Sequence, residues 1–205
     1  MHKSSHILCI ITARGGSKRL PGKNIKLLLG KPLIAYGIEA AKKSKYIDRV
    51  IVSTDSEEIA AVARGYGAEV PFMRPMELAQ DDTPSVPVLQ HAVNVVEEAG
   101  DTVDIMVLVQ PTSPLVLASD IDAAIEKLVA SGAPTCVSVS ESTGKLNGAV
   151  YAVRRTALME GDTVNNQKDG TTLPMPAERS VDVDTEEDFR MAESYLRSKQ
   201  PLTKQ

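Results

Sequence analysis

Short runs of β-branched and other apolar residues alternate along the chain with longer stretches in which apolar residues recur every three or four positions. The short runs predict extended segments at residues 7–12, 49–54, 69–73, 104–109, 135–140 and 149–153. The longer stretches predict helices at residues 32–45, 56–66, 86–99, 119–131 and 185–198. Apolar strands that alternate with helices are typical of a mainly parallel sheet with helices on both faces. We therefore expect a single α/β domain of three layers over residues 1–205.

Polar segments rich in glycine, charge or proline follow the predicted strands. They are residues 14–26, 54–56, 74–85, 110–115 and 182–184. In doubly wound sheets ligands bind beyond the carboxyl ends of the strands. We therefore expect the binding site to be built from these five segments.

The composition is that of a folded, core-forming protein, with 42% apolar residues, 24% charged residues and a net charge of −4. The net acidity argues against a general nucleic-acid binder. No apolar run reaches the roughly 20 residues that span a bilayer, so we expect no membrane partner. Cys9 and Cys136 each lie inside an apolar run, which favours buried thiols over a disulfide and suits a cytoplasmic location.

The positive charge is concentrated near the start of the chain, because seven lysines and arginines precede the first acidic residue, Glu39. Residues 13–24, the cation loop, contain four of these cations and three glycines: Arg14, Lys18, Arg19 and Lys23 with Gly15, Gly16 and Gly22. Glycines let backbone amides approach a phosphate, and the cations match the charge of a triphosphate. The spacing fits neither a Walker A loop nor G-x-G-x-x-G. A lysine-rich surface turn is the alternative interpretation.

Near the other end of the chain, Asp182 and Asp184 are separated by one residue. In an extended segment both carboxylates would lie on one face, with Val181 and Val183 directed into the core. Two carboxylates beside a triphosphate are suited to Mg²⁺. The alternative is that they are solvated residues before a helix that Thr185 caps, with Asp188 completing a capping box. Both interpretations can hold at once.

The cation loop resembles the signature of the cytidylyltransferases that activate nine-carbon acidic sugars, the acylneuraminate (CMP-sialic acid synthetase-like) family with its legionaminic and pseudaminic acid relatives. Further segments match that family in order: 52–56 (V-S-T-D-S), 74–75 (R-P), 78–79 (L-A), 81–85 (D-D-T-P-S), 110–115 (Q-P-T-S-P-L), 146–151 (L-N-G-A-V-Y) and 179–184 (R-S-V-D-V-D). The resemblance implies a Rossmann-like nucleotide-diphospho-sugar transferase fold. It also implies attack by an anomeric hydroxyl on the α-phosphate of CTP, with release of pyrophosphate.

The resemblance assigns roles residue by residue. The catalytic residues would be Arg14, Lys18, Lys23 and Asp184; the nucleotide-binding residues would be Arg14, Gly15, Gly16, Ser17, Lys18, Lys23 and Asn24, with Arg74 and Ser85 at the cytosine. Gln110, Asn147 and Tyr151 would contact the sugar acid, and Asp182 and Asp184 would hold Mg²⁺. The alternative for Arg74 is an ordinary exposed arginine, and for Tyr151 a core or rim position.

Two departures from the family pattern concern the sugar acid and the oligomer. Val116 stands where the family usually has arginine, and only residues 141–145 separate two predicted strands that a much longer segment joins in relatives. That segment carries the arm of the usual homodimer and an Arg-Gln pair that contacts the sugar, and this sequence contains no Arg-Gln pair. We therefore expect a dimerisation arm that is shortened or missing near 141–146. Two other functions stay open: a Kdo-type or other sugar nucleotidyltransferase, and a CTP-binding protein with little turnover.

Overall fold

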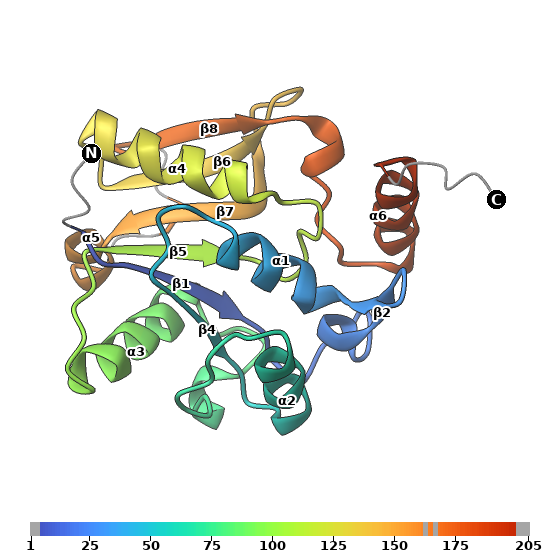
Figure 1. Cartoon of the computed structure of the whole chain (residues 1–205), viewed down its shortest axis with the longest axis horizontal. Helices are drawn as coiled ribbons and strands as arrows, with labels where there is room; N and C mark the ends of the chain where they lie inside the picture. The colour runs from blue at the N-terminus through green and yellow to red at the C-terminus, as the bar shows by residue number, and fades with distance from the viewer. Residues whose placement is uncertain (1–4, 162–163, 166–167, 200–205) are drawn as a thin grey trace.

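The computed structural model describes residues 5–161, 164–165 and 168–199 of the chain. Its centre is a six-stranded sheet with the strand order β4–β1–β5–β7–β6–β8 (Figure 1). The strands are β1 (Ile7–Thr12), β4 (Arg49–Ser53), β5 (Ile105–Val109), β6 (Thr135–Ser140), β7 (Leu146–Arg154) and β8 (Thr171–Met175). β1 is parallel to β4 and β5, and β6 is parallel to β8. Only β7 runs antiparallel to its neighbours, so the expected mainly parallel α/β sheet is confirmed with one reversed strand.

Helices follow most of the strands. They are α1 (Leu33–Lys42), α2 (Glu57–Gly65), α3 (Ser85–Glu98), α4 (Ala118–Ser131), α5 (Arg155–Met159) and α6 (Glu186–Lys199). All of them except α5 lie at nearly the predicted positions. α2 begins after Ser56, whose hydroxyl accepts a hydrogen bond from the amide of Ile59 at 3.4 Å. α4 ends at Gly132, whose φ of 70° favours glycine. Among the described residues, no helix combines the length and apolarity needed to cross a membrane.

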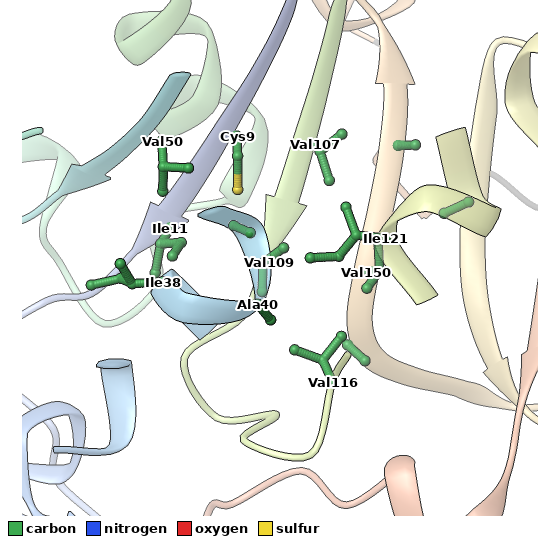
Figure 2. Packing of buried hydrophobic residues seen from close by; sticks show 14 of the residues in the cluster. Cys9, Ile11, Ile38, Ala40, Val50, Val107, Val109, Val116, Ile121 and Val150 are labelled. Atoms are coloured by element: carbon green, nitrogen blue, oxygen red, sulfur yellow. The ribbon is translucent and has the colours of Figure 1, made fainter. Parts of the chain in front are cut away.

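The two faces of the sheet bury alternate residues of each central strand. In β1, Ile7, Cys9 and Ile11 belong to one apolar cluster, while Leu8 and Ile10 belong to another. The first cluster lies under α1, α2 and α4, and Figure 2 shows Ile38, Ala40 and Ile121 packed over Cys9, Ile11, Val107 and Val109. The second lies under α3 and α5. Because both faces are covered, the strands are continuously apolar, and the structure has the three layers that the sequence predicts.

A third apolar cluster lies beyond the carboxyl ends of β1 and β5, on the side where α6 packs (Figure 1). Phe189 and Ala192 of α6 meet Leu33, Leu115 and Val183 there. Burying a phenylalanine of this kind contributes roughly 1.5–3 kcal/mol. The cluster therefore fixes α6 beside the carboxyl ends of the strands, where ligands are expected to bind.

Three elements were not predicted, and one prediction was wrong. Residues 69–73 do not form a strand; only Glu69 makes an isolated parallel bridge, to Ile51 of β4. The missed elements are β8, α5 and the small hairpin of β2 (Leu27–Leu28) and β3 (Lys31–Pro32). β8 is an edge strand whose sequence T-T-L-P-M lacks an apolar run and contains Pro174, which only an edge accommodates well.

β6 and β7 are joined by a tight turn over residues 141–145. The amide of Gly144 donates to the carbonyl of Ser140 at 2.7 Å, and the amide of Ser140 donates to the carbonyl of Lys145 at 2.8 Å. β7 consequently starts at Leu146, three residues before the predicted 149–153. The short connection therefore forms a closed reversal between neighbouring strands, while the consequence for dimerisation stays a prediction.

The two cysteines are free thiols buried in the core, as predicted. Burial raises the pKa of Cys136 to about 11 and raises the pKa of Cys9 further still. Both side chains therefore act as small apolar groups.

Candidate active site

The cation loop leaves β1 at its carboxyl end and is tied down at several backbone positions. The amide of Ala13 donates to the carbonyl of Ser53 at 3.0 Å, and the amide of Gly15 donates to Oδ1 of Asp55 at 2.8 Å. A Cβ on Gly15 would lie 3.2 Å from Cβ of Ser56, which is closer than most side chains tolerate. The loop therefore needs glycine where it crosses the end of β4.

The second half of the loop turns back toward its beginning. Gly22 has a φ of 63°, a left-handed conformation that favours glycine, and a 3₁₀ turn over Lys23–Ile25 follows. Asn24 is buried, and its Nδ2 donates to the carbonyl of Arg14 at 3.0 Å. In this structure the predicted nucleotide-binding residue Asn24 therefore closes the loop on itself.

Two carboxylates from distant parts of the chain face the cations of the loop. Asp184 accepts from Nζ of Lys23 at 2.8 Å and from Nη1 of Arg19 at 3.1 Å. Asp81 forms ion pairs with both Arg14 and Lys18. These side chains and Ser17 line one cavity of about 350 Å³. The cation loop and Asp184 line the same cavity, as predicted from the sequence. Asp81 also lines this cavity and was not predicted to belong to the site.

Residues 181–184 have the alternation that the sequence predicts. Val181 and Val183 are buried in the cluster under α6, whereas Asp182 is exposed and Asp184 is half-buried. The amide of Val183 donates to the carbonyl of Thr112 at 2.8 Å, which fixes the segment beside the end of β5. The segment is not part of the sheet ladder; this hydrogen bond, a second one from the amide of Asp184 to Oδ2 of Asp188 at 3.1 Å and the two buried valines position the carboxylates.

The predicted capping box is present immediately after these aspartates. Oδ2 of Asp188 accepts from the amide of Thr185 at 2.8 Å, and Oγ1 of Thr185 accepts from the amide of Asp188 at 3.3 Å. Asp182 and Asp184 contribute no side chain to this cap. Both interpretations of the sequence are therefore compatible with the structure, since the cap does not use the two carboxylates and Asp184 faces the cation loop instead.

The carboxylate of Asp182 lies in an environment that disfavours its charge. Crowding by protein atoms raises its pKa, and the nearby Asp184 adds to the increase. A cation between the two aspartates would relieve both effects. No histidine, cysteine or third acidic residue joins them within the described residues, so the donor set is unlike a closed zinc site. It fits Mg²⁺, which uses one or two carboxylates, water and substrate phosphates.

A smaller cavity of about 160 Å³ adjoins the larger one, because Arg14, Ser17 and Lys23 line both. Its other lining residues include Asn24, Gln110 and Thr112. Gln110 follows β5 directly and is half-buried. The structure therefore brings the predicted sugar contact Gln110 next to the predicted triphosphate ligands.

Arg74 is buried rather than exposed, with 7% of its surface accessible, so the interpretation as an ordinary surface arginine is wrong. Its guanidinium donates to Oγ of Ser53 at 3.0 Å and to the carbonyl of Ser53 at 2.5 Å. Burial lowers the pKa of Arg74 to about 10, although Asp55 acts in the opposite direction. Ser85, the other predicted cytosine contact, is exposed in the first turn of α3.

Asn147 and Tyr151, the other two predicted sugar contacts, are both buried residues of β7. Oδ1 of Asn147 accepts from Oγ of Ser138 at 2.6 Å and from the amide of Ala149 at 3.2 Å, and its Nδ2 donates to Oγ of Ser180 at 3.0 Å. Tyr151 is 7% exposed, and burial raises its pKa. In the described part of the chain, neither residue lines the two cavities above.

The structure is a three-layer α/β domain in which a glycine-rich cation loop follows the first strand and faces the carboxylate of Asp184. This is the architecture of a nucleotidyltransferase. Residues 8–201 match the cytidylyltransferase family, and the chain belongs to it. The fold resembles that of a CMP:2-keto-3-deoxy-manno-octonic acid synthetase solved in complex with CTP, with a TM-score of 0.76 at 18% identity over 96% of this chain and 100% of that one.

Curated relatives are more similar in sequence. The chain is 33% identical to the CMP-N,N'-diacetyllegionaminic acid synthase of Legionella pneumophila over 222 residues, covering 93% of this chain and 96% of the relative. It is 40% identical to the pseudaminic acid cytidylyltransferase of Campylobacter jejuni over 144 residues, covering 70% of this chain and 62% of the relative. The first alignment has 222 positions but uses 93% of 205 residues, so about thirty of its positions have no counterpart in this chain.

Proposed function

We propose that the protein transfers CMP from CTP to a nine-carbon acidic sugar of the sialic, legionaminic or pseudaminic acid type, with release of pyrophosphate. One observation carries the proposal: cations of one loop and the carboxylate of Asp184 line a single cavity. That arrangement suits a triphosphate, because it supplies fixed positive charge on one side and a possible metal ligand on the other. The names of the Legionella and Campylobacter relatives support the sugar class.

Both substrates of this reaction are anions, so the protein has to supply positive charge and alignment. Arg14, Lys18 and Lys23 would bind the triphosphate together with the amides of residues 15–17. Negative charge builds up on the leaving pyrophosphate, and these fixed cations would stabilise it most strongly at that stage. Arg74 and Ser85 would recognise the cytosine. The guanidinium of Arg74 is already oriented by its hydrogen bond to Ser53 and would donate to the base.

The sugar acid would bind at the smaller cavity, where Gln110 provides an amide beside Lys23. Asn147 would contribute through its remaining N–H, because its oxygen already accepts two hydrogen bonds and one N–H is used by Ser180. Tyr151, four residues further along β7, would contribute its hydroxyl. These roles require the sugar to reach toward β7 from the cavity at the end of β5.

Asp182 and Asp184 would hold Mg²⁺, whose positive charge would reduce the repulsion between the phosphates and the attacking hydroxyl. Lys23 lies 2.8 Å from Asp184, so it would keep this carboxylate oriented toward the triphosphate. The raised pKa of Asp182 supports the assignment, because a carboxylate held in an unfavourable environment gains most from a bound cation.

Pyrophosphate release from CTP tests the proposal when a panel of sialic, legionaminic, pseudaminic and Kdo acids is offered with Mg²⁺. Turnover with a nine-carbon acid is the expected result, and turnover with Kdo alone would select the Kdo-type alternative. Lys23→Met should abolish most activity, whereas Lys127→Met, at an exposed position of α4, should not. Loss of activity in both variants would show that the effect does not depend on a lysine in the cavity.

The second candidate, a CTP-binding protein with little turnover, rests on the tight turn at residues 141–145. This turn stands where the family resemblance places a dimerisation arm with additional sugar contacts. Separate titrations with CTP and with a nine-carbon acid, followed by calorimetry, distinguish the two candidates. Tight binding of CTP with neither binding nor turnover of any acid would select the second candidate.

A further inference from the structure

Asp81 bridges two cations that come from a different part of the chain. One carboxylate oxygen meets Nη1 of Arg14, and the other meets Nζ of Lys18. The side chain of Asp81 is 40% exposed and that of Lys18 is 79% exposed, so the contact lies at the open side of the cavity. An anion placed between two cations of the cation loop occupies the kind of position that a phosphate takes.

The segment that carries Asp81 is attached to the protein mainly at its ends. It lies between the 3₁₀ turn Met76–Leu78 and the start of α3, and the backbone amide of Arg74 anchors it by donating a hydrogen bond to the carbonyl of Thr54 at 2.7 Å. Asp81 itself has no role in the predicted reaction. The ion pairs lower its pKa, so it is fully ionised at neutral pH and presents a permanent negative charge to the cavity.

We propose that Asp81 determines the affinity for the triphosphate: in the nucleotide-free protein its carboxylate takes the place of an outer phosphate, and it leaves Arg14 and Lys18 when CTP binds. This inference rests on the proposed function, since it requires a triphosphate at the cation loop. The step is an exchange of ion pairs and makes or breaks no covalent bond.

Two consequences distinguish Asp81 from a residue that merely adds negative charge. Ligands with outer phosphates, CTP and pyrophosphate, have to displace it, whereas CMP does not. After the transfer, Asp81 would pair with Arg14 and Lys18 again and so assist the release of pyrophosphate. Exposed ion pairs are individually weak and are screened by salt, so the effect on affinity should be moderate, about 3- to 10-fold at low ionic strength.

The test is isothermal titration of CTP, inorganic pyrophosphate and CMP into the wild-type protein, Asp81→Asn and Asp82→Asn, with and without Mg²⁺. Asp82 is the exposed neighbour of Asp81, so its variant changes the net charge equally and controls for long-range effects. Asp81→Asn should bind CTP and pyrophosphate about 3- to 10-fold more tightly and CMP unchanged, and the difference should shrink as salt is added. Asp82→Asn should match the wild type.

Unchanged or weaker binding of CTP by Asp81→Asn would overturn the inference, as would an equal gain in Asp82→Asn. Failure of the wild-type protein to bind either CTP or pyrophosphate, with or without Mg²⁺, would instead overturn the proposed function. Thermal unfolding of each variant establishes that it is folded. Because asparagine has the shape of aspartate and the position is partly exposed, we expect the unfolding temperature to change little.

Discussion

Because the guanidinium of Arg74 is buried, we expect its replacement to raise the stability of the protein and to weaken the binding of CTP. Arg74 is 7% exposed, and its hydrogen-bond partners are the hydroxyl and carbonyl oxygens of Ser53. Among the described residues it forms no ion pair, although Asp55 is near enough to attract it. A buried cation that is hydrogen-bonded but has no ion-pair partner is unfavourable for folding, which favours a functional reason for its presence.

The size of the effect follows from the pKa. Burial lowers the pKa of Arg74 from the ordinary value of an arginine to about 10, and each pKa unit corresponds to about 1.4 kcal/mol, so the charge costs the folded state about 3 kcal/mol. Arg74→Met removes this cost but also loses two hydrogen bonds of about 1 kcal/mol each. The carbonyl of Ser53 keeps the amide of Ala13 as a donor. We therefore expect the free energy of unfolding to rise by about 1 kcal/mol, while CTP affinity falls about tenfold or more.

Urea unfolding at pH 8 and calorimetry with CTP measure the two effects. Arg49→Met is the matched control, because Arg49 pairs with Glu69 and Asp101 and its pKa is raised. That variant should be less stable than the wild type and should bind CTP normally. A loss of stability in Arg74→Met as large as that in Arg49→Met would refute the reasoning. Above about pH 10 the unfolded chain retains the proton of Arg74 while the folded one loses it, so the penalty declines as the pH rises from that value.

Three further predictions concern single side chains. Lys23→Met should weaken CTP binding about 10- to 100-fold in calorimetry, because a charged hydrogen bond to the triphosphate is lost. Asp120→Asn should lower the free energy of unfolding by about 2–3 kcal/mol in urea, because Nε and Nη2 of Arg179 both donate to this buried carboxylate at 3.0 Å. Thr185→Ala should cost about 1 kcal/mol by removing the cap of α6, whereas Thr185→Ser should cost little.

Each of these predictions has a result that contradicts it. Unchanged CTP affinity in Lys23→Met would exclude this lysine from the binding site. For the buried pair, Asp120→Leu combined with Arg179→Met should lose less than the sum of the single losses, and strict additivity would show that the pair is not coupled. Equal losses in Thr185→Ala and Thr185→Ser would assign the effect to packing rather than to the hydroxyl.

The sequence predicts those helices and strands well whose apolar residues recur with a clear helical or strand-like spacing. Five of the predicted extended segments are strands of the sheet, and all five predicted helices form within a few residues of their expected ends. The direction of β7 could not be predicted, because the same apolar run suits a parallel and an antiparallel neighbour. β8 was missed for a related reason: an edge strand needs no apolar run, and its threonines and proline are typical of loops.

The candidate site was predictable to the extent that it depends on the topology of the sheet. The cation loop follows β1 and Gln110 follows β5, and the carboxyl ends of neighbouring parallel strands meet at one edge. Asp81 could not be placed by this rule, because it comes from a connection of irregular structure and meets Arg14 only through the folding of that connection. Long-range ion pairs have no local signal in a sequence, although Asp81 lies in one of the segments that resemble the family.

The two departures from the family pattern bear on the recognition of the sugar carboxylate. Val116, which replaces an arginine expected from the resemblance, is 4% exposed and packs in the core shown in Figure 2. Arg179 is already engaged, since its Nε and Nη2 both donate to the buried carboxylate of Asp120. The cations that line the cavity beside Gln110 in the described part of the chain are Arg14 and Lys23, which are also the proposed ligands of the triphosphate. On the proposed function, a sugar acid would share these cations with the nucleotide, and we expect its binding to strengthen when Mg²⁺ is added with CTP.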